Sequence, residues 1–134
     1  HQMKIFLTLC LVVILTSCEA PPLDEGKCIT LVEAHMKEAS AQNYDAVLEM
    51  YDPSFLESEP ADLKLEKLKK LYEALGPVED FDFINATDVK EVGVPRQMKL
   101  EYGVRHAKAS TIETFVVIEA EGGYKIAGYY VEVS

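Results

Sequence analysis

The stretch TIETFVVIEAEGGYKIAGYYVEV, residues 111–133, decides the fold of this chain. Its first part, 111–121, carries Ile112, Thr114, Val116 and Ile118 on one alternating face and Phe115 and Val117 on the other. Apolar residues on both faces predict a central strand of a sheet. The next two residues are Gly122 and Gly123, a pair typical of a tight hairpin turn, and residues 124–133 predict the last strand.

Two more strands are expected before this hairpin. After Pro77 the spacing of apolar residues changes from the helical period of about 3.6 to the strand period of about 2. Phe81 and Phe83 alternate in the first of these strands. The second carries a longer alternation, made of Met98, Leu100, Tyr102, Val104 and His106. The pattern therefore predicts a curved antiparallel sheet of about four strands.

Three helices are expected ahead of the sheet. Apolar residues at helical spacing predict the first helix over 24–41, and a second is expected over 43–50 with Asn43 as its N-cap. The third spans 60–75 and ends at Gly76 and Pro77, with Lys64, Lys67 and Lys70 on a solvated outer face. Helices followed by an antiparallel sheet predict an α+β fold in which the helices pack on one face of the sheet.

Residues 1–17 are expected to be removed from the mature protein. His1 and Gln2 read as an addition before Met3, and Lys4 supplies the basic start of a signal peptide. The apolar run IFLTLCLVVIL, residues 5–15, has the length of a signal-peptide core and is shorter than the ~20 residues of a membrane-spanning helix.

The four residues LTSC, 15–18, resemble the bacterial lipobox. In that family the cysteine receives a diacylglyceryl group and becomes the N-terminus after cleavage, which implies a lipidated Cys18. The resemblance implies a cell-envelope location, on the periplasmic face of an outer membrane or, with one membrane, on the outer face of the cytoplasmic membrane. The alternative is an ordinary signal peptide that is cleaved elsewhere.

The mature chain is expected to consist of a lipidated tether, 18–27, and one domain, 28–134. Lys4 is the only charged side chain in the removed part, so 12 basic and 23 acidic side chains remain, a formal charge of −11. That balance argues against a nucleic-acid-binding surface and against docking on anionic lipid headgroups. Membrane attachment is therefore expected to come from the lipid.

The order of segments resembles the NTF2-like (cystatin-like α+β cone) domains of small bacterial lipoproteins. The resemblance rests on the first helix, on NYDAVLEMYDPSFL (43–56), on the leucine-rich helix ending in Leu75 and Gly76, and on EAEGGYKIAGYYVEV (119–133). It implies a curved sheet folded round three helices, a pocket between them, and frequent dimerisation through the open face of the sheet. Enzymes of that superfamily place an aspartate and a histidine or tyrosine in the cone, and many members lack catalytic residues.

Few residues of the mature chain suit catalysis or metal binding. Cys28 is its only thiol besides Cys18 and is expected to be a small buried side chain. It lies seven residues from His35, roughly 10 Å along a helix, which is too far for a cysteine–histidine pair. The two histidines, His35 and His106, do not have the spacing of zinc ligands, and no phosphate-binding loop is present. No catalytic residue, metal or cofactor is therefore predicted.

One group of side chains is a candidate ligand site. Tyr102 and His106 lie on the same side of one predicted strand, about 13 Å apart, so they cannot hydrogen-bond directly. Together with Tyr130, and with Tyr51 or Tyr72, they are expected to line an apolar pocket with polar tips.

Acid–base catalysis would need a carboxylate that faces inward beside His106. Glu101 and Glu113 have the wrong alternation for that position, although both faces of the strand that carries Glu113 are apolar.

The sequence favours a lipid-anchored, non-catalytic module that binds a small hydrophobic molecule or a protein partner, including a second copy of itself. The alternative is an isomerase or hydratase that acts on a small hydrophobic substrate through His106 and a carboxylate. A third interpretation is an assembly component whose outer sheet face pairs with another protein. That interpretation predicts an exposed apolar patch, made of Phe115, Val117, Tyr129 and Val131.

Overall fold

The computed structural model describes residues 21–134, so the predicted leader, Cys18 and the start of the tether lie outside the described residues. The helices, in chain order, are α2 (Glu25–Ser40), α3 (Tyr44–Glu49), α4 (Pro53–Ser58) and α5 (Ala61–Leu75). They precede the strands β1 (Val78–Val89), β2 (Gln97–His106), β3 (Ser110–Ala120) and β4 (Gly123–Val133). Over residues 21–134, none of the helices has the length and apolarity needed to cross a bilayer.

The predicted α+β class is confirmed, with one helix more than expected between residues 21 and 134. The additional helix, α4, begins at Pro53, which was expected only to end the preceding helix. Asp52 caps α4, because its carboxylate accepts a hydrogen bond from the Ser54 backbone N–H at 3.0 Å. Pro53 then occupies the first helical position, where a missing N–H leaves no bond unmade.

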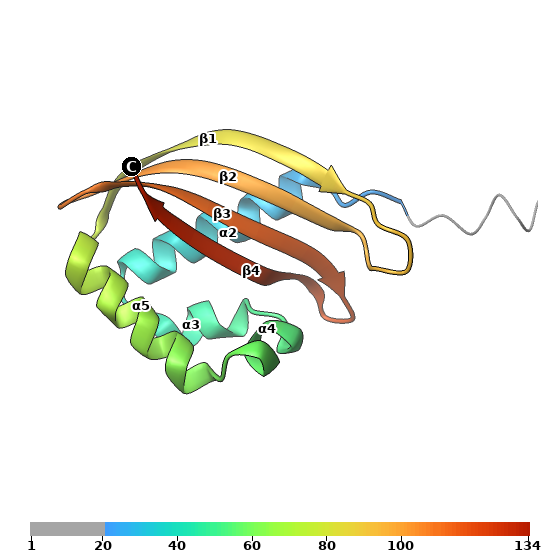
Figure 1. Ribbon diagram of the computed structural model, residues 1–134, viewed down its shortest axis with the longest axis horizontal. Helices are drawn as coiled ribbons and strands as arrows, with labels where there is room; N and C mark the ends of the chain where they lie inside the picture. The colour runs from blue at the N-terminus through green and yellow to red at the C-terminus, as the bar shows by residue number, and fades with distance from the viewer. Residues whose placement is uncertain (1–20) are drawn as a thin grey trace, which may run out of the picture.

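The four strands form an antiparallel meander in the order β1-β2-β3-β4, with the helices on one side of the curved sheet (Figure 1). The junction of α3 and α4 is attached to the edge of β4 by two backbone bonds. The N–H of Asp52 donates to the carbonyl of Ile126, and the N–H of Ile126 donates to the carbonyl of Met50, each at 2.8 Å. These bonds hold the short helices against the last strand.

The core lies between α2 and the inner face of the sheet. It contains Cys28, Val32, Met36, Leu100, Tyr102, Val104, Phe115, Val117 and Ile126. The inward residues of β3 are Thr111, Glu113, Phe115 and Val117, and its even-numbered residues face outward. The prediction of an exposed apolar patch on the outer face of the sheet is therefore wrong, because Phe115 and Val117 are fully buried. Both faces of β3 are apolar, so alternation alone does not identify the inner one.

Candidate functional site

A buried carboxylate, Glu113, is the centre of a polar network inside the cone. Only 2% of Glu113 is exposed, and its carboxylate accepts three hydrogen bonds of 2.7 Å. The donors are His106 Nε2, the Thr111 hydroxyl and the Tyr129 hydroxyl. Burial alone would raise the pKa of Glu113, but the three hydrogen bonds outweigh it and lower the pKa. Glu113 is therefore an ionised carboxylate. The sequence predicted that its side chain does not face inward, and that prediction is wrong because the side chain is buried.

His106 is held as a cation by its two neighbours. Its Nε2 faces Glu113 and its Nδ1 faces the carbonyl oxygen of Gly76 at 3.3 Å. A neutral imidazole has one N–H, whereas the protonated ring can donate to both acceptors. The hydrogen bond to Glu113 raises the pKa of His106, although burial opposes it. The pair is thus a buried ion pair.

His35 has the opposite character although it lies in the same interior. Its Nε2 is 2.8 Å from the Tyr51 hydroxyl, and its Nδ1 is buried without a hydrogen-bond partner in the described part of the chain. The rings of Phe115 and Tyr129 pack edge-on against it. Burial lowers the pKa of His35 to about 4, so its ring is neutral at pH 7.

The space beside these groups is small. A cavity of about 30 Å³ is lined by His35, His106, Glu113 and Tyr129, together with residues of α2 and α5. That volume holds one or two water molecules. The histidine–carboxylate pair that acid–base chemistry would need is therefore present, but the cavity beside it has no room for an organic substrate.

The four predicted ligand-binding residues lie in different environments. Tyr102 is fully buried, packs edge-on against Phe81 and donates a hydrogen bond to Glu33 at 3.2 Å. His106 lines the small interior cavity, as does Tyr72. Tyr51 and Tyr130, in contrast, both line a groove beside β4. The structure therefore does not bring the four side chains to one common wall.

Tyr130 differs from the other three because it faces outward. It is 62% exposed, and its ring lies over Gly128, where an added Cβ would be 3.2 Å from Tyr130 Cε2. The register pairs Phe115 with Tyr129 and Thr114 with Tyr130, so the two tyrosines lie on opposite faces of the sheet. Tyr130 therefore contributes to the rim of the groove rather than to the interior.

A groove lies between β4 on one side and Tyr51, α4 and α5 on the other, and is called the β4 groove. It has a volume of about 480 Å³. Its lining includes Tyr51, Phe55, Leu68, Leu71 and Tyr129, with the charged residues Glu59, Lys64 and Lys67. Leu68, Leu71 and Tyr129 also line the interior cavity, so the groove lies directly outside it.

Lys64 is the unexpected residue of the β4 groove. It was expected on a solvated face, but only 6% of it is exposed. Its Nζ lies 3.3 Å from the centroid of the Phe55 ring and 3.6 Å from a carboxylate oxygen of Glu59. Burial lowers the pKa of Lys64, and Glu59 opposes that shift. The sequence did not reveal this position because Phe55 belongs to α4, the helix that was not predicted.

The charges around Lys64 do not cancel. Lys67 also forms an ion pair with Glu59, so two ammonium groups share one carboxylate. The groove is locally cationic in a chain whose formal charge is −10. An apolar, aromatic groove with one buried cation suits an amphipathic molecule with an anionic end.

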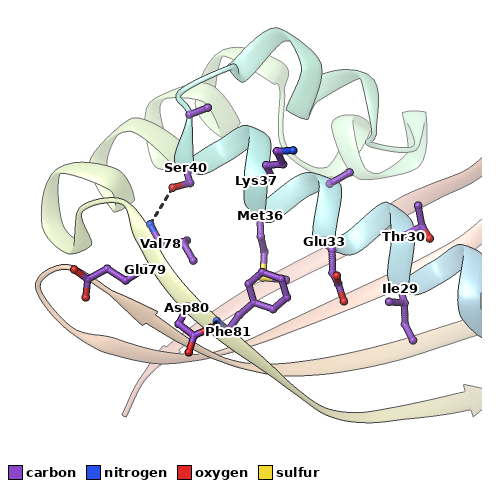
Figure 2. A pocket seen from close by; sticks show the side chains of 12 residues that line it. Ile29, Thr30, Glu33, Met36, Lys37, Ser40, Val78, Glu79, Asp80 and Phe81 are labelled. Atoms are coloured by element: carbon purple, nitrogen blue, oxygen red, sulfur yellow. Dashed lines mark hydrogen bonds between the residues drawn. The ribbon is translucent and has the colours of Figure 1, made fainter.

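A second groove, of about 650 Å³, lies between α2 and the start of β1 and is called the α2–β1 groove. Figure 2 shows the side chains of Ile29 and Glu33 extending from α2 toward the strands. The Val78 N–H donates to the Ser40 hydroxyl at 2.9 Å, which ties the strand to the helix at one end of the groove (Figure 2). Glu33, Glu79 and Asp80 outnumber Lys37 in the lining, so this groove is acidic.

The described residues contain no group of three or more histidine, cysteine, aspartate or glutamate side chains that could hold a metal ion. Cys28 and His35 are both buried on α2.

Comparison with known proteins supports the fold. No protein-family model matches the chain, and no curated protein is significantly similar to it in sequence. Among solved structures, Bd1075 of Bdellovibrio bacteriovorus superposes with a TM-score of 0.56 at 13% identity, over 81% of this chain and 40% of that one. This chain thus spans less than half the length of Bd1075.

The β subunit of the benzoate 1,2-dioxygenase of Burkholderia mallei is also similar, with a TM-score of 0.54 at 12% identity over 86% of this chain and 93% of that one. At such identities the likeness is one of fold. With the helices on one face of an open four-stranded sheet, it confirms the expected NTF2-like architecture.

Proposed function

We propose that this chain is a lipid-anchored protein of the bacterial cell envelope whose NTF2-like domain binds a small amphipathic anion in the β4 groove without transforming it. The lipobox-like LTSC at 15–18 supports the anchor. The buried Lys64 ammonium in an aromatic groove is the observation that carries the binding proposal.

The size and lining of the groove suit such a ligand. Its volume of about 480 Å³ lies within the roughly 300–1,000 Å³ of ordinary small-molecule sites. Phe55 and the two leucines offer an apolar surface, and Lys64 offers an ammonium group whose attraction to an anion is stronger in this buried site than in water. Because Lys67 also pairs with Glu59, a ligand carboxylate can bind Lys64 without leaving Glu59 unpaired.

We prefer binding to catalysis because the interior of the domain leaves too little space for a substrate beside its histidine–carboxylate pair. The histidine–carboxylate pair of the interior is His106 and Glu113, and the cavity beside this pair holds only one or two water molecules. The 2.7 Å contact of that pair nevertheless supports a second candidate, an isomerase or hydratase of a small hydrophobic substrate. That candidate requires the interior to open through Leu68 and Leu71, which line both spaces.

The binding proposal is tested by calorimetric titration of residues 21–134 with decanoate and with the uncharged decanol. The Lys64→Met variant should bind decanoate at least about tenfold more weakly, because it loses a charge-assisted contact of about 1.5–3 kcal/mol. It should bind decanol unchanged. The matched control is Lys69→Met, an exposed lysine of the same helix.

Decanoate binding that survives in the Lys64→Met variant, or that falls equally in the Lys69→Met variant, contradicts the assignment. Release of a chemically altered decanoate analogue, seen by mass spectrometry of the supernatant, would favour the enzyme.

The anchor is tested separately by expressing the full chain in a bacterium and measuring the mass and the membrane fraction of the mature protein. A diacylglyceryl modification on Cys18, lost with the membrane association in a Cys18→Ala variant, is the expected result. A mature protein that begins at another residue and carries no lipid contradicts it.

A further inference from the structure

The tether enters the domain at one end of its long axis. Helix α2 begins at this end, and the backbone N–H of Asp24 donates to the Tyr124 hydroxyl at 2.8 Å (Figure 1). Tyr124 is the second residue of β4, directly after the hairpin turn. The point of entry is therefore fixed beside the turn between β3 and β4.

The loop between β1 and β2, residues 90–96, lies at the same end (Figure 1). The strand register agrees, since Val89 pairs with Gln97, Gln97 with Ile118, and Ile118 with Lys125. This loop presents two apolar side chains to solvent, Val92, which is fully exposed, and Val94, which is 42% exposed. Gly93 separates them with φ of +80°, a conformation that favours glycine.

We propose that Val92 and Val94 contact the membrane at the boundary of headgroups and acyl chains. This inference rests on the proposed lipidation of Cys18, because the lipid brings this end of the domain to the bilayer. From Cys18 to Asp24 the chain spans six residues, at most about 20 Å when fully extended at ~3.5 Å each. Apolar side chains held so close to a membrane are stabilised by burial at its interface.

The contact would orient the domain. The 12 residues of β1 extend about 40 Å at ~3.3 Å per residue, and the turn between β2 and β3 lies at the opposite end. The long axis would therefore stand away from the membrane. The acidic side chains at the membrane-facing end, Asp24, Glu25, Glu91 and Glu121, are partly offset by Lys27, Lys90 and Arg96. The chain as a whole carries a formal charge of −10, so contact should be stronger on zwitterionic than on anionic lipid.

The test uses the absence of tryptophan from the chain, which makes one introduced tryptophan a clean reporter. The mature chain, 18–134, contains every described element and can be coupled through Cys18 to a maleimide lipid in phosphatidylcholine vesicles. Cys28 should not compete, because it is buried and burial raises the pKa of its thiol to about 11. The Val92→Trp variant carries the reporter on the loop, and Lys108→Trp carries it at the opposite end as the control.

The fluorescence of the Val92→Trp variant should shift to shorter wavelength on coupling and be quenched several-fold more by brominated acyl chains than that of Lys108→Trp. Adding phosphatidylglycerol should weaken the quenching at low salt. Equal quenching of the two variants overturns the inference. So does a spectral shift that depends on protein concentration without quenching, since it would mean that a second copy covers the loop.

Chemical coupling also separates the two proposals. It does not depend on lipidation in the cell, so an unlipidated Cys18 refutes the anchor while the loop is still tested. A lipidated protein whose loop is not quenched refutes only the membrane contact.

Discussion

Replacing His35 by glutamine should make the folded domain less sensitive to mild acid, so that the variant loses less unfolding free energy than wild type when the pH falls. His35 is 1% exposed and is bonded to Tyr51 at 2.8 Å, so its ring is neutral in the folded state. Burial lowers its pKa from 6.5 to about 4, against a smaller opposing effect of the Glu113 carboxylate. Between pH 6.5 and about pH 4, the unfolded chain therefore binds a proton at His35 and the folded chain does not.

The sign and size follow from the two pKa values. A lowered folded-state pKa gives stability that is complete above pH 6.5 and is lost as the pH falls from 6.5 towards 4. Between pH 7.5 and pH 4.5 the loss due to His35 is about 2.5 kcal/mol of unfolding free energy. Urea unfolding of residues 21–134 at the two pH values, followed by circular dichroism, measures it.

The difference between wild type and the His35→Gln variant isolates this residue, because the other titrating groups contribute to both proteins. Wild type should lose about 2.5 kcal/mol more than the variant between the two pH values. The control is His106→Gln. The pKa of His106 is raised, so its stabilisation is present at low pH and lost as the pH rises, and the difference should change in the opposite direction. A wild-type-to-His35→Gln difference that is the same at both pH values would refute the buried neutral histidine.

Two further predictions concern the scaffold. The Glu113→Gln variant should lose about 3–5 kcal/mol of unfolding free energy, because it breaks a buried ion pair and cannot accept all three hydrogen bonds. The exposed Glu119→Gln should change little in the same urea titration, and equal losses would contradict the network. The Gly76→Ala variant should lose about 1–2 kcal/mol, because Gly76 has φ of +79° and an added Cβ would lie 3.1 Å from Ala107 Cβ. Thermal unfolding measures this loss, and the control is Gly122→Ala, where an added Cβ meets open space. An unchanged stability of the Gly76→Ala variant would contradict the expected backbone strain.

Much of the fold was predictable because local spacing controls it. Apolar alternation located β2, which ends at His106 as expected, and the glycine pair located the turn before β4. Helical spacing located α2, and Asp24 caps it by accepting from the Lys27 N–H. Helix α4 was missed because Pro53 was interpreted only as the end of the preceding helix, whereas it occupies the first position of α4, directly after the capping residue Asp52.

The candidate site was less predictable because it depends on which face of a strand is inside. Alternation places Glu113 on the same face as Phe115, but it does not say that this face is buried. Pairing across the sheet decides that, since Tyr102 and Glu113 are register partners and Tyr102 faces the core. Lys64 likewise becomes a buried cation only because Phe55 packs over it from another helix.

The sequence by itself determined the α+β order of elements and their approximate bounds, since both follow from residue spacing along one segment. It also carries the lipobox-like LTSC, which remains a prediction because residues 15–18 lie outside the described part of the chain. Only the tertiary structure decided the ion pair of His106 with Glu113, the neutral His35 and the buried Lys64. Each depends on burial and on partners distant in the chain, which set the free energy of a charge and are not written in local spacing.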